Sequence, residues 1–367
     1  MREKQQNFTV EARRRVGKQE NAVANQQPFQ NMLRFSARIA FHHMPAKTNI
    51  QANAAKFRTS LLRWFQREQR KLPWRGTSDP YHILVSEIML QQTRVAVVED
   101  RYRKFVQQFP TVERLARSRE QTVLASWSGL GYYRRARALH ASAKEIIKNG
   151  GFPASAEALR ELPGVGRYTA AAVASIALGE ATAVVDGNVQ RVLRRLYGKQ
   201  LSDEACWQAA GTLLDQRHPG DFNQGMMELG ALVCLPGQPL CPECPVAALC
   251  ASQGPGEKAE QAPRKKAVLR YVLLRQDRNV FLQQRAATNS LMPGMWELPL
   301  CHDAVRPETA PLLKLRHSIT NTDYTVLVFS GGTEHGSKGR WVSLRSVERL
   351  PLTGLARKVL DRLELLG

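Results

Sequence analysis

The sequence predicts a mainly helical domain followed by a smaller α+β domain. The chain has 367 residues, which exceeds the usual size of one domain. Apolar residues recur at helical spacing over most of the chain, and short strand-like segments replace this pattern towards the C-terminus. We therefore expect a basic extension over residues 1–55, a helical domain over 56–250, a linker over 251–266 and the α+β domain over 267–367.

The helical domain is indicated by segments whose apolar residues repeat with a period of about 3.6 residues. These segments are LLRWFQREQ, YHILVSEIMLQQ, TVLASW, ARALHASAKEII and VQRVLRRL. Their succession predicts an all-α domain.

The C-terminal part has a different pattern. The stretch ASQGPGEKAEQAPRKKA has the Gly, Pro and charge content typical of a linker. After it, YVLLR and VFLQQR flank a QDRN turn, and YTVLVF has the composition of a further strand. The final segment, LTGLARKVLDRLELL, is predicted to form a helix.

The charge of the chain favours a polyanionic partner. The formal net charge is +21 at pH 7 and the isoelectric point is about 10.2. Such an excess points first to nucleic acid, although charge alone does not separate DNA from RNA or acidic lipid. No long uncharged apolar run is present, so we expect no membrane span.

Residues 1–55 carry nine Lys or Arg against three Glu and are rich in Gln and Asn, so we expect them to be disordered. Within them, MLRFSARIAFHHMP bears Arg and lacks acids. This composition fits an organelle presequence, and an upstream start site explains it equally well. Unless the extension is a targeting segment, the expected location is cytoplasmic.

The stretch LPGVG, with a helical segment on each side, predicts a phosphate-binding hairpin. Backbone N–H groups around Gly164 and Gly166 would point at an anion from the start of a helix. Taken alone, the same stretch is more often an ordinary turn between two helices. The strongly basic chain favours the phosphate-binding interpretation.

Two carboxylates are candidates for acid and charge chemistry. Glu87 shares a helix face with Ile83, Leu84 and Leu90, so its carboxyl should be partly desolvated and its pKa raised. Asp186 follows an apolar run and precedes an amphipathic helix. A protonated and a charged carboxyl together suit cleavage of a glycosidic bond. The alternatives are a Glu tied to an Arg at the core edge and an Asp that only caps its helix.

Four cysteines form a compact group in CLPGQPLCPECPVAALC: Cys234, Cys241, Cys244 and Cys250. Four thiolates in one loop favour a [4Fe–4S] cluster over structural zinc, which more often uses two separated C-x2-C pairs. A disulfide framework is the least favoured interpretation.

Several strings, in order and spacing, make residues 57–366 resemble the A/G-specific adenine DNA glycosylases of the endonuclease III superfamily. The strings are LPWR, VSEIMLQQTRV, WSGLGYYRRARAL, LPGVGRYTA, VVDGNVQRVL, MMELGALVC, the four cysteines and LPLTGLARK. The resemblance implies a two-lobed helix-hairpin-helix domain with a [4Fe–4S] loop over residues 234–250. It also implies removal of adenine mispaired with 8-oxoguanine or guanine in base excision repair.

The resemblance also implies roles for individual residues. Glu87 matches the general acid that protonates adenine N7, Asp186 the carboxylate that stabilises the oxocarbenium sugar, and Asn188 the amide that helps to hold the catalytic water and acids. Trp74, Arg75 and Glu228 match positions of the adenine pocket.

Gln92 and Tyr132 match side chains that the family wedges into the base stack around a flipped nucleotide. Without the resemblance, Tyr132 would be interpreted as an interior aromatic.

Tyr168 directly follows LPGVGR, where bifunctional relatives carry a lysine whose amine attacks the sugar. A phenol cannot form that imine. We therefore expect a monofunctional glycosylase that leaves the strand intact.

The C-terminal domain resembles the family's Nudix-like module, which recognises 8-oxoguanine, and no Nudix catalytic box follows LMPGMWELP. Where the family typically has Phe-Ser-His, this chain has Ile319, Thr320 and Asn321, or, in an offset alignment, residues 316–318. Ser318, Thr320 and Asn321 are the expected recognition residues.

The expected partner is double-stranded DNA with A:8-oxoguanine or A:G mispairs, bound by a monomer associated with the bacterial nucleoid. Two other functions compete. A bifunctional endonuclease III-like enzyme for oxidised pyrimidines would carry Lys at position 168, and a non-catalytic DNA-binding protein would not need both Glu87 and Asp186.

Overall fold

The computed structural model describes residues 50–254, 263–289, 291–301, 310–319, 321–331 and 339–366. Most of the predicted extension and half of the predicted linker therefore lie outside the described residues. Among the helices that the structure describes, none is long and apolar enough to cross a membrane.

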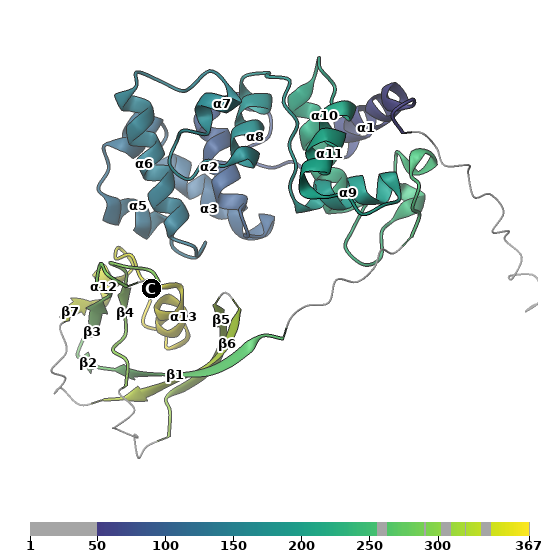
Figure 1. Cartoon of the computed structure of the whole chain (residues 1–367). Helices are drawn as coiled ribbons and strands as arrows, with labels where there is room; N and C mark the ends of the chain where they lie inside the picture. Colours follow the sequence, from purple (N-terminus) through teal and green to yellow (C-terminus); the bar gives the residue numbers. More distant parts are fainter. Residues whose placement is uncertain are drawn as a thin grey trace, which may run out of the picture. The chain divides into compact units, whose positions relative to one another are not determined.

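The predicted helical domain is present and consists of two lobes (Figure 1). The first lobe packs around a core that contains Tyr81, Phe105, Trp127 and Leu139. Its helices are α2 (Pro80–Leu90), α3 (Val95–Gln108), α4 (Val112–Ala116), α5 (Glu120–Ser126), α6 (Arg134–Lys148), α7 (Ala156–Leu159) and α8 (Arg167–Ala177).

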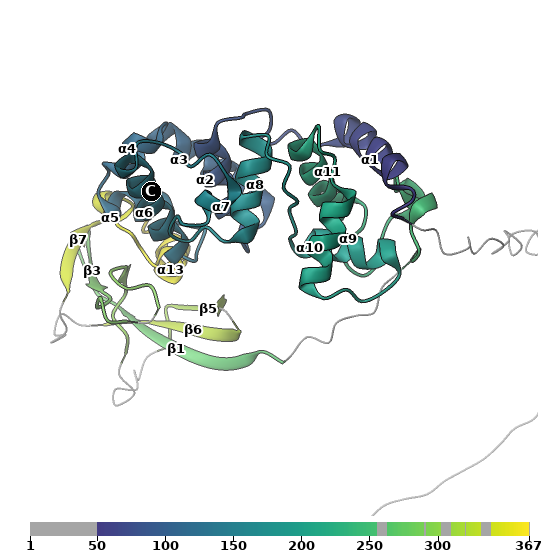
Figure 2. The same ribbon diagram turned by 45° about the horizontal axis from the view of Figure 1, so that its top comes forward.

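The second lobe combines the beginning and the end of the helical domain. Helix α1 (Ala54–Glu68) lies beside α11 (Pro219–Leu232), as Figures 1 and 2 both show. Their apolar faces share a core with α9 (Gly187–Tyr197) and α10 (Asp203–Leu213). The short 3-10 turns η1 (Cys241–Glu243) and η2 (Ala247–Leu249) follow α11.

Helix α8 connects the two lobes. Its Ala171 and Ala172 pack with Val184 in a small separate cluster. At its first residue, Arg167 Nη1 donates to Glu204 Oε2 of α10 over 2.6 Å, and the guanidinium lies 4.0 Å from the Trp207 ring centroid. The start of α8 is therefore held against the second lobe.

The predicted hairpin joins α7 to α8. Gly164 has φ +75°, and a Cβ there would lie 2.4 Å from the Cβ of Ala138 on α6. Gly166 is the N-cap of α8, with φ −88°. Gly164 is thus required by both its backbone conformation and its close approach to α6.

The C-terminal domain has the predicted α+β composition. Strand β1 (Lys265–Leu273) runs parallel to β6 (Thr322–Ser330), with Lys265 opposite Thr322. Strand β5 (Leu313–Ile319) pairs with β6 in antiparallel orientation. A second sheet contains β2 (Arg275–Gln276), β3 (Asn279–Gln284), β4 (Trp296–Glu297) and β7 (Arg340–Ser343).

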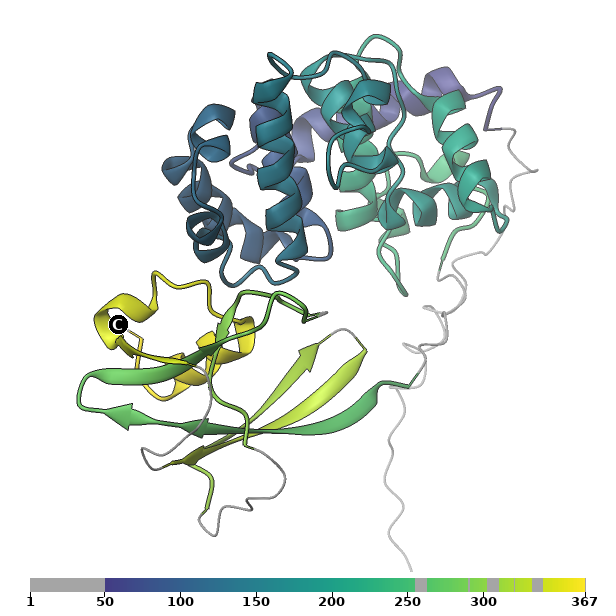
Figure 3. The same ribbon diagram turned by 60° about the vertical axis from the view of Figure 1, so that its left-hand side comes forward.

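Helix α13 (Gly354–Arg362) packs against the strands of the C-terminal domain, and α12 (Leu344–Val347) precedes it in the chain. Leu355, Val359 and Leu360 of α13 share a core with Val326 and Val328 of β6. Figure 3 shows β1 (green) and β6 (yellow-green) side by side, with α13 (yellow) in the same domain.

Two predicted boundaries are wrong. Ile50 is buried and α1 begins at Ala54, so the helical domain starts inside the segment assigned to the basic extension. Helix α2 ends at Leu90, whereas the apolar pattern predicted helix as far as Gln92. Gln92 has φ +56°, a left-handed conformation that cannot continue a helix.

The contrast between the two hairpin glycines gives a test of the fold. Gly164→Ala should lower the free energy of unfolding by about 2 kcal/mol or more, since the new methyl group meets both a left-handed backbone and Ala138. Gly166→Ala should leave it almost unchanged, because nothing lies within 4 Å of its Cβ position. Urea unfolding of both variants measures the difference, and equal losses would contradict the assigned hairpin geometry.

Candidate functional site

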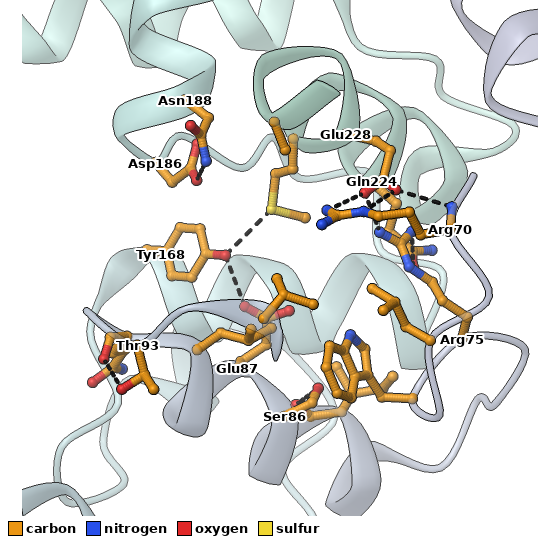
Figure 4. Close-up of a pocket in the computed structure, with 18 of the residues that line it drawn as sticks. Arg70, Arg75, Ser86, Glu87, Thr93, Tyr168, Asp186, Asn188, Gln224 and Glu228 are labelled. Carbon is orange, nitrogen blue, oxygen red and sulfur yellow. Dashed lines mark hydrogen bonds and ion pairs between the residues drawn. The ribbon is translucent and has the colours of Figure 1, made fainter. Parts of the chain in front are cut away.

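A cavity of about 650 Å³ lies between the two lobes and gathers most of the predicted site residues (Figure 4). The predicted residues in its lining are Trp74, Arg75, Glu87, Gln92, Tyr168, Asp186, Asn188 and Glu228. They come from α2, α8, α9, α11 and the segments before and after α2. Residues that are far apart in the sequence thus meet in one place.

Glu87 is the buried acid of this cavity. It lies in the last half of α2, its residue is only 5% exposed, and burial raises the pKa of its carboxyl to about 7. The hydrogen bond from Tyr168 and the charge of Arg75 act in the opposite direction, while Asp186 adds to the rise. The predicted desolvation of Glu87 is confirmed, and its carboxyl carries a proton for a large part of the time near neutral pH.

The side chain of Tyr168 points at Glu87 inside the cavity (Figure 4). Its hydroxyl donates to Glu87 Oε2 over 2.7 Å and lies 3.3 Å from the sulfur of Met227. Burial, followed by the charges of Glu87 and Asp186, raises the pKa of Tyr168 well above its usual value. Tyr168 therefore remains a protonated donor, and although it directly follows the hairpin in sequence, its side chain lines the cavity.

Asp186 both caps a helix and lines the cavity. One oxygen, Oδ1, accepts from the backbone N–H of Val189 over 2.7 Å, as an N-cap does. The other, Oδ2, accepts from the amide of Asn188 over 3.0 Å. From the sequence, Asp186 was either a helix cap or a functional carboxylate. In the structure it caps α9 and also lines the cavity, and the capping hydrogen bond fixes its carboxylate there.

Asn188 belongs to a chain of hydrogen bonds that reaches the cysteine segment. Arg191 Nη2 donates to Asn188 Oδ1 over 2.9 Å, and its Nε donates to the carbonyl of Cys234 over 2.8 Å. A Cβ on Gly230 of α11 would lie 2.7 Å from the Cβ of Asn188, so a glycine is needed for α9 and α11 to approach here. The position of Asn188 is thus set from the α11 side.

Glu228 lines the cavity, but two arginines occupy its oxygens. Arg70 donates to both carboxylate oxygens over 2.7 and 2.9 Å, and Arg75 Nη2 donates to Oε2 over 3.0 Å. Burial by itself would raise the pKa of Glu228, but hydrogen bonds from Arg70 and the two positive charges outweigh it, and the pKa is lowered. Glu228 is a charged anchor that positions the guanidinium groups around the cavity.

Arg70 and Gln224 line the cavity although the sequence did not single them out. Gln224 Oε1 accepts from Arg75 Nη1 over 2.7 Å. Gln224 precedes Glu228 by four residues, so a helical wheel of α11 places both on one face, and this was the available signal. Arg70 lies before LPWR in an irregular segment, where no periodicity indicates its direction.

Trp74 forms part of the cavity wall and is buried. Its ring meets Tyr102 of α3 in an edge-to-face arrangement, with the ring centroids 5.3 Å apart. This contact anchors the LPWR segment to the first lobe.

Gln92 and Tyr132 lie in two separate loops, one after α2 and one before α6. Gln92 lines the cavity, whereas Tyr132 is 49% exposed. Both have left-handed backbones, with φ +56° and +47°. Such conformations are unfavourable for residues other than glycine and often occur at functional sites.

Of the predicted recognition residues of the C-terminal domain that the structure describes, only Ser318 lines a cavity. Ser318 lines a second cavity of about 380 Å³ together with Tyr132, His317 and Ile319. Thr320 lies outside the described residues, and Asn321 is exposed in the turn between β5 and β6. The cavity lining thus takes His317 and Ser318 from the offset alignment and Ile319 from the other alignment.

The four cysteines line one small cavity of about 30 Å³, next to Arg195. Arg195 Nη1 lies 3.3 Å from Cys234 Sγ, and burial raises the pKa of Cys244 to about 11 and that of Cys250 above its usual value. Crowded, desolvated thiols become thiolates only when a cation balances their charge, so this set suits a metal group. In the described part of the chain, no three or more His, Cys, Asp or Glu side chains are already arranged around a metal position.

Comparison with known proteins identifies the relatives of the helical domain. Residues 85–208 match the family of HhH-GPD superfamily base excision DNA repair proteins. The adenine DNA glycosylase of Homo sapiens is 47% identical over 216 residues, which are 54% of this chain and 40% of the human protein. The chain thus spans less than half the length of that relative.

Other similarities extend further. An adenine DNA glycosylase of Buchnera aphidicola subsp. Acyrthosiphon pisum is 32% identical over 281 residues, or 72% of this chain and 79% of the relative. The structure of a thermostable thymine-DNA glycosylase matches 56% of this chain and 97% of its own length, with a TM-score of 0.52 and 33% identity. The helical domain therefore has the helix-hairpin-helix glycosylase fold.

The raised pKa of Glu87 predicts a pH-dependent stability. The folded state holds the Glu87 proton more tightly than the unfolded state, so this contribution to stability is complete below pH 4.5 and is lost as the pH rises through about 7. Glu87→Gln removes the cost of ionising a buried acid. Relative to wild type, this variant should gain about 3 kcal/mol between pH 4.5 and pH 8.

Urea unfolding of wild type and Glu87→Gln at pH 5 and pH 8 measures this gain. Glu161→Gln, which changes an exposed carboxyl, is the matched control. A gain that does not depend on pH would contradict the assigned burial of the Glu87 charge.

Proposed function

Because the chain belongs to the adenine DNA glycosylase family, we propose that it is a monofunctional glycosylase. In this proposal it hydrolyses the N-glycosidic bond of adenine mispaired with 8-oxoguanine or guanine in double-stranded DNA. It acts as a monomer on chromosomal DNA in the cytoplasm. The observation that carries the proposal is the pair of unlike carboxyls, Glu87 and Asp186, in one cavity.

Glu87 acts as the general acid. Tyr168 donates to its Oε2, so the proton that Glu87 delivers is carried by Oε1. Transfer of this proton to N7 lets the electrons of the C1′–N9 bond move to the adenine ring, and the bond breaks. A pKa of about 7 suits an acid that must release its proton near neutral pH.

Asp186 stabilises the cationic sugar that this step leaves. Its oxygens are held by the Val189 N–H and by Asn188, so the charge is in place before the reaction. Water then adds to C1′, and its proton returns to Glu87. The arginines anchored on Glu228 and the amide of Gln224 surround the adenine, and Trp74 supplies an apolar wall.

The C-terminal domain is assigned a Nudix-like role in recognising the oxidised base. The cavity shared by Tyr132, His317 and Ser318 supports this role, because it combines an exposed aromatic ring with polar side chains. Preference for 8-oxoguanine over guanine opposite adenine is expected to arise there.

Incubation with duplexes that carry one A:8-oxoguanine, A:G or A:T pair tests the activity. Wild type should release adenine from the first two and not from A:T. Glu87→Gln and Asp186→Asn should each reduce the single-turnover rate by about a hundredfold or more with little change in DNA affinity.

Glu161→Gln is again the control for the change of charge. Ser318→Ala should lower the rate ratio of A:8-oxoguanine to A:G. Release of an oxidised pyrimidine instead of adenine would favour the endonuclease III-like alternative, and binding without base release would favour a non-catalytic protein.

Tyr168 predicts an unbroken DNA strand after base release, because a phenol cannot form an imine with C1′. The product should break only after alkali or heat, and borohydride should trap little protein on the DNA. Tyr168→Lys should gain trapping, since the cavity desolvates the new amine and keeps part of it neutral. Efficient trapping of wild type that disappears when Tyr168 is replaced would refute the monofunctional assignment.

The four cysteines are proposed to hold a [4Fe–4S] cluster that orders the segment after α11. When bound, the cluster supplies a structural link and no electron to base release. Anaerobically purified protein should contain iron and absorb broadly at about 400 nm. Cys241→Ser should lose iron and lower the thermal midpoint, whereas stoichiometric zinc without iron would contradict the assignment.

A further inference from the structure

The loops that carry Gln92 and Tyr132 meet at one half-buried side chain, Arg135. One loop follows α2 and the other precedes α6, and Arg135 lies in the first turn of α6. The two loop residues are forty positions apart in the sequence and both have left-handed backbones. Left-handed backbones are unfavourable for residues other than glycine, so the contacts that stabilise these two loops are of interest.

One nitrogen of Arg135 binds the end of α2. Nη1 donates to the carbonyls of Ile88 and Met89, each over 3.0 Å, and to the carbonyl of Gln91. Carbonyls at a helix C-terminus lack partners within the helix and carry its negative dipole end. Helix α2 has no basic residue in its own last turn, so Arg135 supplies the positive charge.

The other nitrogen connects this end of α2 to the second loop. Nη2 donates to Thr93 Oγ1 over 3.0 Å and to the carbonyls of Leu130 and Gly131 over 3.1 and 3.4 Å. The guanidinium also lies 5.2 Å from the Tyr132 ring centroid. The residues on both sides of Gln92 and those just before Tyr132 are therefore bonded to one planar group.

A lysine could not make these contacts. The guanidinium presents its donors in a fixed plane towards two loops, whereas an ammonium has three donors at a single point. Burial lowers the pKa of Arg135 to about 10, which still leaves it charged at neutral pH.

We propose that Arg135 is a positioning residue that couples the two loops, so that Gln92 and Tyr132 enter the base stack as one unit. This inference rests on the proposed function, which gives both side chains a role in the distorted duplex. It adds that neither side chain acts at full strength when the other loop is detached. Arg135 itself does not touch the reacting atoms.

The test measures unstacking separately from chemistry. Wild type and Arg135→Lys are mixed with an A:8-oxoguanine duplex that carries the fluorescent base 2-aminopurine beside the target adenine. The fluorescence of 2-aminopurine rises when it is unstacked. Arg135→Lys keeps the charge, so duplex affinity should change by about threefold or less. The fluorescence amplitude and the single-turnover rate should both fall by about tenfold or more.

Arg114→Lys is the matched control, because it makes the same change at an exposed arginine of α4 that lines neither of the two cavities. It should leave the amplitude unchanged. Equal behaviour of Arg114→Lys and Arg135→Lys would overturn the proposal.

A double-mutant cycle separates coupling from general loss of structure. In wild type, Gln92→Ala and Tyr132→Ala should each lower the fluorescence amplitude strongly. In the Arg135→Lys background, both effects should become small, since both side chains are already disengaged. If both substitutions keep their full effects there, Arg135 has only a structural role and the proposal fails.

Thr93→Val provides the test if Arg135→Lys shows no cooperative thermal transition. It removes one acceptor of Nη2 with almost no change of shape. If the loops are coupled, the effects of Gln92→Ala and Tyr132→Ala should then both shrink, and an undiminished Tyr132 effect would overturn the coupling. The fluorescence reports unstacking and does not require cleavage of the glycosidic bond. If the wild type unstacks the duplex but releases no adenine, the proposed function is refuted, and the test of loop coupling still holds.

Discussion

The burial of the Glu87 carboxyl is the constraint on which the candidate site depends. A carboxyl inside a protein is stable only if it is protonated or compensated by charge, and here both effects operate in part. Burial raises its pKa to about 7, while the Tyr168 hydrogen bond and Arg75 limit the rise. Helix α2 of the first lobe carries Glu87, and α8 at the junction of the lobes carries Tyr168. The two helices must therefore keep a fixed distance for burial and the Tyr168 hydrogen bond to act on the same carboxyl.

Several arginines of this basic chain are used inside the molecule. Arg70 and Arg75 converge on Glu228, Arg135 binds carbonyls of two loops, and Arg191 connects Asn188 with Cys234. Each guanidinium fixes segments that lack regular hydrogen bonds of their own. The net charge of +21 thus reflects internal construction as well as attraction to a polyanion.

The hydrogen bonds from Asp186 through Asn188 and Arg191 to Cys234 bring two predicted sites into one framework. The same N-cap that begins α9 fixes the carboxylate at the cavity, and the same helix carries Arg191 and Arg195 towards the cysteines. A change at the cysteine segment therefore has a direct physical route to the orientation of Asp186.

The sequence by itself determined the helical domain, the α+β domain and the burial of Glu87, because apolar periodicity records which face of an element is turned inward. It also predicted the turn between two helices at LPGVG, because Gly and Pro are common in such turns, whereas the left-handed backbone of Gly164 came from the structure. It could not place Tyr168 on Glu87, the arginines on Glu228 or Arg135 between two loops. These contacts join residues tens to more than a hundred and fifty positions apart, in separate helices or in a helix and a loop that no local periodicity relates. Only the packing of the lobes decides which distant side chains meet, because hydrogen bonds depend on distances of a few tenths of an ångström that no local pattern encodes.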